Sequence, residues 1–319
     1  MKAVLLDEKR FSEGVDLPAP ESLSEYVTFE KTPHDNALII ERCQDADIVI
    51  AGSVRFEKEV IDALPNLKLL QLSTVGSNQV DKQACEANNV TLLTAPDFAT
   101  ESVAEHTFML MLNAMRAGLY YHNHVADGTW HHSRKNALVD ESIVDLHQLT
   151  LGLIGVGDIG RRISHLAQAF GMTVLWAERQ GKTPRNEDYT AFETVLAQSD
   201  VLSLQCPWTE ETEHLINADT LAKMSNKPLI VNVARGKVVD SQAVADALKA
   251  DKIMGYASDV YEQEPADTTD PIVQLANKKH PRVILSPHHA AASKAAQRKL
   301  WGIVRRQVSE FAEQYSAKV

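Results

Sequence analysis

The sequence predicts an α/β protein made of two doubly wound parallel-sheet domains. Short apolar runs of strand length alternate with helical stretches along the chain, which is typical of parallel sheets covered by crossover helices. A glycine-rich turn at 155–160 joins a strand to a helix near the middle of the chain. The 319 residues, of which 44% are hydrophobic, suffice for two separate cores.

The first hundred residues predict the smaller domain, a flavodoxin-like sheet. Ligands of such sheets bind beyond the carboxyl ends of the strands. Two glycine-bearing loops lie there, Gly52-Ser53 and residues 73–78. The second loop offers exposed N–H groups suited to a carboxylate, although a plain tight turn would carry the same residues. Strands are expected at 3–6, 47–51, 67–72 and 90–93, and helices at 33–43, 57–64 and 81–88.

A strongly apolar helix is expected from Ser102 to Met115, and its first residues, 102–105, have the spacing of a capping box. Because the helix has little polar face, we expect it to be buried between domains or between subunits, and we expect a homodimer. Residues 122–146 are expected to form an irregular arm. Its histidines lack carboxylate or cysteine partners at ligand spacing, so no metal site is expected; they are His122, His124, His131 and His132.

The glycine-rich turn belongs to the second domain, for which a Rossmann sheet is expected. The last segment, 294–315, predicts one long helix that returns to the first domain. The expected domains are therefore residues 1–100 plus 290–319, and residues 101–289. Strands are expected at 150–154, 173–177, 201–205, 229–233, 255–260 and 283–285, and helices at 192–198, 218–224 and 241–250.

Each glycine of the turn has a physical task. Gly155 permits a tight turn out of the strand, Gly157 lets the backbone approach a pyrophosphate, and Gly160 lets helix and strand pack closely. The helix N-terminus favours the anion. Glu178 lies 18 residues past Gly160, where a carboxylate can accept hydrogen bonds from a ribose diol, so NAD(H) is expected. Arg179 could meet a 2′-phosphate, but Glu178 would repel that phosphate, which makes NADP(H) less favoured.

Composition excludes several classes of function. The net charge of −11, with no basic run to offset it, opposes binding to nucleic acid or anionic lipid. Cys43, Cys85 and Cys206 lie far apart, so neither a disulfide framework nor a zinc site is expected. The apolar stretches are of strand length and the N-terminus runs directly into a strand, so a cytoplasmic location is expected.

Three polar residues follow strands of the second domain, near the expected nicotinamide. They are Arg235, Glu264 and His288. Any one of them could be a cap, a solvated acid or a turn histidine. Together, a permanently charged arginine, a titratable histidine and a carboxylate that orients it form the set that a 2-keto acid reductase needs.

Several further motifs accompany these residues: Leu151–Gly160, Ser199–Pro207 with His214–Asn217, Asn232–Gly236, Ser258–Tyr261 with Glu264-Pro265, and Pro287-His288. Through them the chain resembles the D-isomer-specific 2-hydroxyacid dehydrogenases over essentially its whole length. The resemblance implies that His288 is the general acid/base, Glu264 its partner and Arg235 the clamp on the substrate carboxylate and carbonyl. The N–H groups of Val75 and Gly76 would hold the other side of the carboxylate.

The resemblance also implies which residues touch the cofactor. Asp259 would bind the nicotinamide carboxamide, and the backbone from Val233 to Arg235 would line its pocket. The expected cofactor-binding residues are Gly155, Gly157, Asp158, Ile159, Gly160, Glu178, Cys206, Pro207, Val233, Ala234, Arg235, Asp259 and His288.

Within this family the chain most resembles glycerate dehydrogenases, also called hydroxypyruvate reductases, through residues 175–181. Hydroxypyruvate or glyoxylate is therefore the expected substrate, giving D-glycerate or glycolate. A D-lactate or broad 2-keto acid reductase is the alternative enzyme. An NAD-sensing binding protein resembling the corepressors of this fold is the alternative of another class. His289 stands where many relatives have an aliphatic residue.

Overall fold

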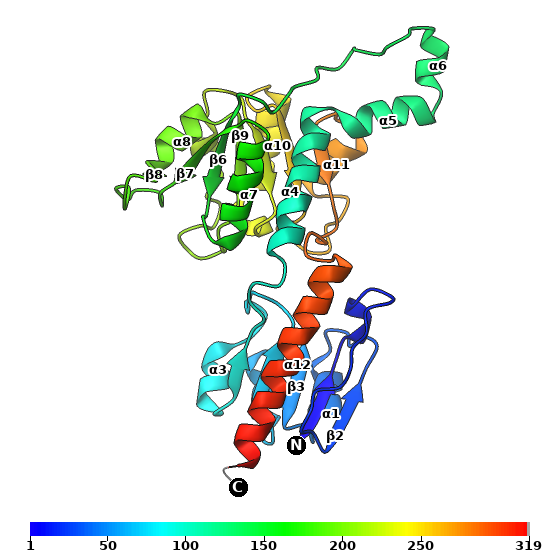
Figure 1. Cartoon of the computed structure of the whole chain (residues 1–319), viewed down its shortest axis with the longest axis vertical. Helices are drawn as coiled ribbons and strands as arrows, with labels where there is room; N and C mark the ends of the chain where they lie inside the picture. Colours follow the sequence, from blue (N-terminus) through cyan, green and yellow to red (C-terminus); the bar gives the residue numbers. More distant parts are fainter. Residues whose placement is uncertain (318–319) are drawn as a thin grey trace. The chain divides into compact units, whose positions relative to one another are not determined.

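The computed structural model describes residues 1–317, which divide into two compact units (Figure 1). One unit consists of Met1–Ala99 together with the segment that begins at Ala291. The other is Thr100–Ala290. Each unit has its own parallel sheet covered by helices, which confirms the predicted α/β class with two doubly wound domains.

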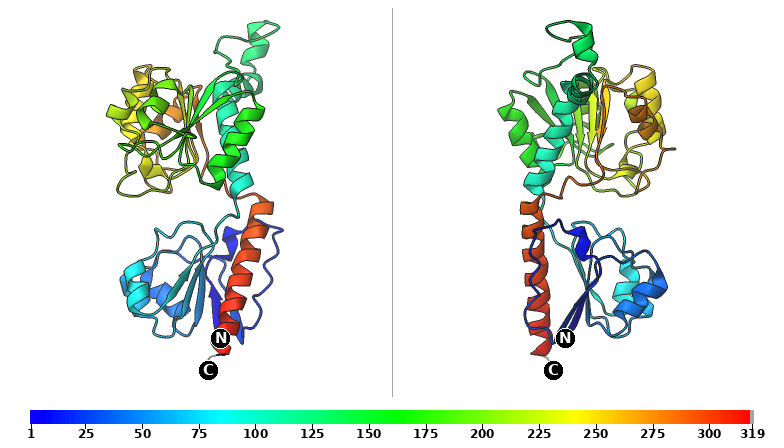
Figure 2. Two further views of the ribbon diagram at one scale, coloured as in Figure 1. Left: turned by 60° about the vertical axis from the view of Figure 1, so that its left-hand side comes forward. Right: turned by 90° about the vertical axis from the view of Figure 1, so that its right-hand side faces the viewer.

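The first unit contains a five-stranded parallel sheet in the order β2-β1-β3-β4-β5. This is the flavodoxin-like strand order. Figure 2 shows helix α12 (Lys294–Ser316) along one face of the sheet and the blue and cyan helices on the opposite face. The strands are β1 (Lys2–Leu5), β2 (Glu25–Thr28), β3 (Ile48–Ala51), β4 (Leu69–Leu72) and β5 (Thr91–Leu93); the other helices are η1 (Glu8–Arg10), α1 (Asn36–Cys43), α2 (Lys58–Asp62) and α3 (Lys82–Ala87).

The second unit contains a seven-stranded sheet in the order β12-β11-β10-β9-β6-β7-β8. Its order reverses between β6 and β9, where a doubly wound sheet opens a crevice at the strand carboxyl ends. The strands are β6 (Thr150–Ile154), β7 (Thr173–Ala177), β8 (Tyr189–Thr190), β9 (Val201–Leu204), β10 (Leu229–Asn232), β11 (Gly255–Ser258) and β12 (Val283–Leu285).

Helices pack against both faces of this second sheet, and a separate apolar cluster fills each side. Helices α4 and α7 cover one face and α8 to α11 the other. The remaining helices of the unit are α5, α6 and the short η2. Their bounds are α4 (Thr100–Met115), α5 (Gly118–Ala126), α6 (Thr129–Ser133), α7 (Asp158–Ala169), α8 (Phe192–Gln198), α9 (Ala218–Leu221), η2 (Gly236–Val238), α10 (Ser241–Lys249) and α11 (Pro271–Asn277).

Two local predictions are wrong. The helix expected to start at Ser102 starts at Thr100, so Ser102 does not cap it; the Ser102 hydroxyl donates to the carbonyl of Ala290 instead. The segment 122–146 is not wholly irregular, because α5 and α6 occupy its first part. Glycine at 118 and 128 and the polar, aromatic composition hid these two helices, which have no fully buried residue.

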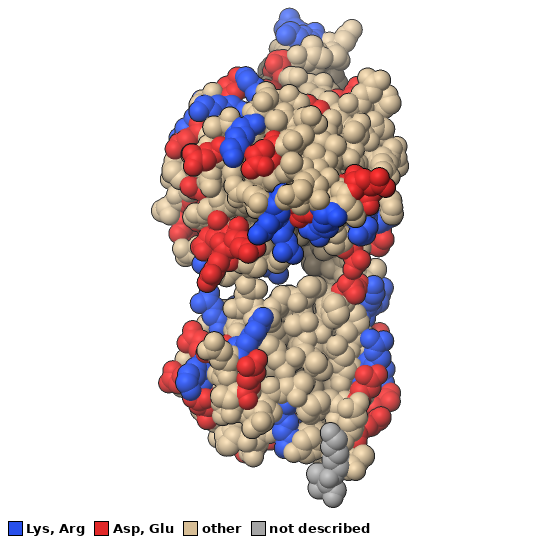
Figure 3. Space-filling view, turned by 90° about the vertical axis from the view of Figure 1, so that its left-hand side faces the viewer, with Lys and Arg blue, Asp and Glu red and all other residues tan. Residues whose placement is uncertain are grey.

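Charged side chains of both signs share the protein surface. Acidic and basic side chains are interspersed over the face shown in Figure 3. All three cysteines are buried and free. Among residues 1–317, no helix is long and apolar enough to span a bilayer. The cytoplasmic location stays a prediction.

Candidate active site

The turn after β6 has the geometry of a dinucleotide-binding loop. Gly155 has a φ of +93°, and a Cβ there would lie 2.6 Å from the amide nitrogen of Cys206. A side chain is therefore excluded twice, by backbone conformation and by the loop after β9. A Cβ on Gly157 would meet nothing within 4 Å, and no side chain caps the N-terminus of α7. The residues present thus leave room and unpaired N–H groups for a pyrophosphate.

Glu178 follows β7, as the ribose-binding acid of such a fold should. Its carboxylate is buried, and each oxygen already has two donors. The amide of Arg179 (2.8 Å) and the guanidinium of Arg185 (2.5 Å) donate to Oε1; the amide (3.0 Å) and Nε (2.7 Å) of Arg185 donate to Oε2. Hydrogen bonds from Arg185 and then from Arg179 lower the pKa of Glu178 to about 2. A ribose contact from Glu178 requires Arg185 to give way, and it stays a prediction.

The loops after β9 and β10 carry the other residues expected at the cofactor. Cys206 and Ala234 are buried, Val233 is partly buried and Pro207 is exposed. The Asn232 side chain shapes the second loop: its oxygen accepts from the amide of Ala234 at 3.0 Å, and its nitrogen donates to the carbonyl of Arg235 at 3.1 Å. These two hydrogen bonds hold the backbone of Arg235 in place. A fixed backbone is what the expected role of Arg235 in substrate binding requires.

Gly236 lets the loops after β10 and β11 touch. A Cβ at this position would lie 1.8 Å from the backbone of Tyr261, so only glycine fits. This close approach brings Arg235 near the segment that carries Glu264. Burial lowers the pKa of Arg235, and the opposite charge of Glu264 offsets part of that effect. The two charged groups are therefore close enough to interact electrostatically.

His288 and Glu264 form a short hydrogen bond. The distance from His288 Nδ1 to Glu264 Oε2 is 2.6 Å, and the amide of Tyr261 donates to the other carboxylate oxygen at 3.0 Å. Burial raises the pKa of Glu264, but the hydrogen bond and charge of His288 outweigh burial, so the pKa is lowered and the acid stays ionised. His288 has a φ of +50°, a conformation in which non-glycine residues are uncommon and which occurs at functional sites. The hydrogen bond to Glu264 orients the imidazole through Nδ1. The other ring nitrogen, Nε2, is therefore available for proton transfer.

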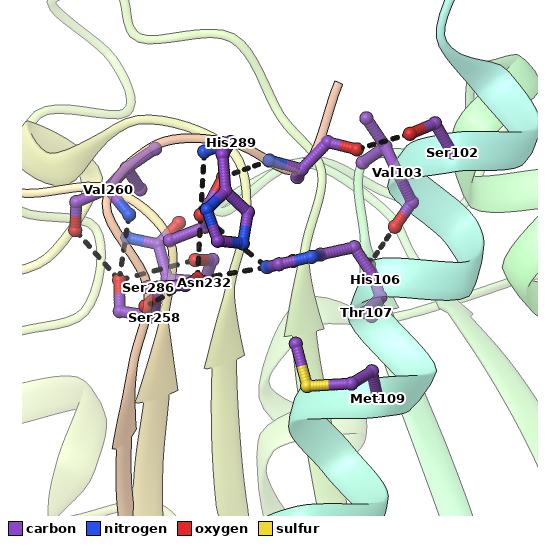
Figure 4. A network of polar contacts seen from close by, with 12 residues as sticks. Ser102, Val103, His106, Thr107, Met109, Asn232, Ser258, Val260, Ser286 and His289 are labelled. Carbon is purple, nitrogen blue, oxygen red and sulfur yellow. Dashed lines mark hydrogen bonds and ion pairs between the residues drawn. The ribbon is translucent and has the colours of Figure 1, made fainter. Parts of the chain in front are cut away.

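Asp259 holds the loop that presents His288. Its Oδ1 accepts from the Ser286 hydroxyl at 2.6 Å and from the His289 amide at 3.0 Å, and its Oδ2 accepts from the Ala290 amide at 2.8 Å. Figure 4 shows Ser286 and His289 of this network beyond the strand ends. Burial raises the pKa of Asp259, but hydrogen bonds from His106, Ser286 and the two amides lower it to about 2. The structure shows that Asp259 holds residues 286–290 in place. Its expected contact with a nicotinamide carboxamide stays a prediction.

The sequence did not single out His106 and Ser286. His106 Nε2 lies 2.9 Å from the Ser286 hydroxyl and 3.4 Å from Asp259 Oδ1, and its ring stands edge-on to that of His289 at 4.9 Å between centroids (Figure 4). The feature that could have identified His106 from the sequence is a histidine in an otherwise apolar helix. The ligand atoms of His106, Asp259 and His289 lie within 4.8 Å of one another. Since protein donors already bind both Asp259 oxygens, we describe this cluster as a hydrogen-bonded support.

Val75 and Gly76 lie in the first unit, in the loop after β4. The Thr74 hydroxyl donates to the carbonyl of Gly76 at 2.7 Å and so shapes the loop. Among the described residues, no amide of residues 74–78 donates a hydrogen bond within the protein. A short row of unpaired N–H groups suits the expected carboxylate, and this role stays a prediction.

Comparison with known proteins agrees with this geometry. Residues 108–290 match the family model described as "D-isomer specific 2-hydroxyacid dehydrogenase, NAD binding domain". The chain is 35% identical to a glycerate dehydrogenase of Methylorubrum extorquens, over 92% of this chain and 91% of the relative. It is 30% identical to a hydroxypyruvate reductase of Blautia hydrogenotrophica, over 98% and 97%.

The chain is also similar to a solved structure of a 2-hydroxyacid dehydrogenase. The D-lactate dehydrogenase of Aquifex aeolicus, complexed with NAD and lactic acid, has a TM-score of 0.80 and 26% identity, covering 99% of this chain and 97% of that one. The chain is an NAD(H)-dependent oxidoreductase that belongs to the D-isomer-specific 2-hydroxyacid dehydrogenase family.

Proposed function

We propose that this chain reduces hydroxypyruvate or glyoxylate with NADH, giving D-glycerate or glycolate. The observation that carries the proposal is the 2.6 Å hydrogen bond between His288 and Glu264, which orients an imidazole beside the loop of Arg235. The relatives named glycerate dehydrogenase and hydroxypyruvate reductase support this choice of substrate class.

The bound NADH supplies a hydride to C2 of the keto acid. His288 donates its proton to the carbonyl oxygen, so each hydroxy acid formed consumes one NADH and one proton. The Glu264 carboxylate stabilises the imidazolium before that transfer. The Arg235 guanidinium binds the substrate carboxylate and stabilises the negative charge that develops on the carbonyl oxygen. The amides of Val75 and Gly76 donate to the carboxylate.

The test is steady-state oxidation of NADH, with NADPH in parallel, against hydroxypyruvate, glyoxylate, pyruvate and phosphohydroxypyruvate. We expect the highest kcat/KM with hydroxypyruvate or glyoxylate and NADH. The absence of turnover despite tight NADH binding would contradict the proposal and favour the nonenzymatic NAD-sensing role.

A D-lactate or broad 2-keto acid reductase is the second candidate. The similarity to a D-lactate dehydrogenase over 99% of this chain favours it. A kcat/KM for pyruvate above that for hydroxypyruvate would identify this activity.

We also propose that the protein is a homodimer formed through the arm of the second unit. Large apolar side chains are exposed on and beside α5 and α6: Leu119, Val125, Trp130, Val139 and Ile143. A stretch of chain that exposes this many apolar side chains is typical of an interface between subunits.

A further inference from the structure

Three loops of the first unit meet at the carboxyl edge of its sheet. Arg10 ends the short helix after β1, Gly52 follows β3, and Ser73 follows β4. These strands are direct neighbours in the order β1-β3-β4. Ser73 also leads into Val75 and Gly76, for which a role in binding the substrate carboxylate is proposed above. The edge therefore lies beside the part of the fold where a 2-keto acid is expected.

Arg10 has a free guanidinium at this edge. The residue as a whole is exposed, but its side chain packs on the loop: burial lowers the pKa of the guanidinium and the charge of Asp7 raises it. Within residues 1–317 the side chain forms neither a hydrogen bond nor an ion pair. The neighbouring Lys9 shows the contrast, because it pairs with Glu30. Five N–H donors of a permanently charged group are thus available for a ligand oxygen.

Gly52 provides the space in which the Arg10 side chain lies. A Cβ on Gly52 would be 2.5 Å from Cδ and 2.8 Å from Nε of Arg10, and 2.7 Å from the Ser73 hydroxyl. Any larger residue at this position would displace Arg10. The arginine is therefore packed over the loop rather than directed away from the protein.

The Ser73 hydroxyl, on the other side of the same space at Gly52, is fully buried and has no hydrogen-bond partner in the described residues. A buried hydroxyl without a partner is destabilising, so its position calls for an explanation. A small shift of the flexible Arg10 side chain toward a ligand would open a second polar group to that ligand.

The loops around Arg10 are held by other residues. Asp7 Oδ2 accepts from the amides of Gly52 (2.9 Å) and Ser53 (2.8 Å). The Gln79 amide donates to the carbonyl of Gly52 at 3.1 Å and to the Thr74 hydroxyl at 3.3 Å, which ties the two glycine-bearing loops together. The polar groups are thus held in place before a ligand arrives.

We propose that Arg10 and Ser73 form a subsite for a hydroxyl group on C3 of the substrate. The inference rests on the proposed reduction of a 2-keto acid. A hydroxyl can accept from the guanidinium and donate to the serine oxygen, whereas the methyl group of pyruvate would leave both unpaired. The buried carboxylate of Asp7, which binds the adjoining loop, disfavours a phosphate at the same place.

The test compares wild type with Arg10→Met, with hydroxypyruvate, glyoxylate, pyruvate and phosphohydroxypyruvate as substrates. Gly52→Ala is the second variant, because it displaces the guanidinium without removing it. Arg55→Met is the matched control: Arg55 is exposed in the same unit, and the same charge is lost. We expect both test variants to lower kcat/KM for hydroxypyruvate about 10- to 100-fold, mainly through KM, with glyoxylate and pyruvate within about three-fold of wild type.

Three outcomes would overturn the assignment. An equal loss for all substrates, or no loss in Arg10→Met while wild type still reduces hydroxypyruvate, would exclude a C3 subsite and leave the proposed function intact. A loss confined to phosphohydroxypyruvate would exclude the hydroxyl as its ligand. Wild type that reduces none of the four acids would overturn the proposed function, and the subsite with it.

Discussion

His288 and Glu264 share one task in the proposed reaction. There the imidazole transfers the proton, and the carboxylate, 2.6 Å from Nδ1, holds the ring and its charge. We expect His288→Ala to lower kcat by about 10²- to 10⁴-fold while the Kd for NADH changes less than about three-fold. Turnover assays and NADH fluorescence titrations measure the two quantities. A comparable loss of NADH affinity would remove His288 from the chemistry.

Glu178 and Arg185 form the charged pair that we expect to set the preference between the two nicotinamide cofactors. The guanidinium neutralises the carboxylate that would repel a 2′-phosphate. We expect Arg185→Met to increase the ratio of the Kd for NADPH to that for NADH about ten-fold, because an unpaired carboxylate remains. Lys182→Met is the charge-matched control from the same loop. Equal shifts in the two variants would show a nonspecific charge effect.

At the scale of elements, Asp259 joins the end of β11 to the segment after β12. Its pKa in the folded protein is about 2, below the ordinary value of 3.8, so it stabilises the fold above about pH 4. That stabilisation declines as the pH falls through about 2. We expect Asp259→Asn to lower the free energy of unfolding by about 2 kcal/mol at pH 7. The difference should be roughly half as large at pH 3. Urea unfolding followed by tryptophan fluorescence measures it, and a difference that does not depend on pH would contradict the assigned cause.

Gly236 allows the loop after β10 to pack against the loop after β11. A Cβ 1.8 Å from the Tyr261 backbone cannot be accommodated without moving one loop. We expect Gly236→Ala to lower kcat/KM by at least about ten-fold, because a displacement of about 1 Å at Arg235 or Glu264 has that effect. Circular dichroism would show whether the fold persists. Full activity in a folded variant would mean that the two loops need not touch.

At the scale of the whole molecule, the arm formed by α5, α6 and the following segment is the proposed interface between subunits. Val139 is the most exposed of its large apolar residues, at 76%. We expect the double variant Val125→Asp, Val139→Asp to sediment as a monomer where wild type sediments as a dimer, since charges in an apolar interface are costly. The same substitution at Val75, in the other unit, serves as the control. A wild-type monomer in sedimentation velocity would contradict the dimer.

The architecture was predictable because both domains repeat one pattern. Buried parallel strands are continuous apolar runs, and β7, α8 and β12 occupy the predicted ranges. The strand β2 was missed because it lies at a sheet edge and has no fully buried residue, and α5 and α6 because they bury little of their surface. Hydrophobic periodicity arises from the burial of one face of an element. Elements that bury little of their surface are therefore difficult to predict from a sequence.

The sequence by itself determined the two-domain α/β class, the glycine-rich turn, the family and the residue types Arg235, Glu264 and His288, because these depend on local spacing. The tertiary structure decided which groups meet: Arg185 with Glu178, His106 and Ser286 with Asp259, and both Arg10 and Ser73 with Gly52. These partners come from different loops and helices, and only the packing of strands into sheets brings them within hydrogen-bonding distance or direct contact.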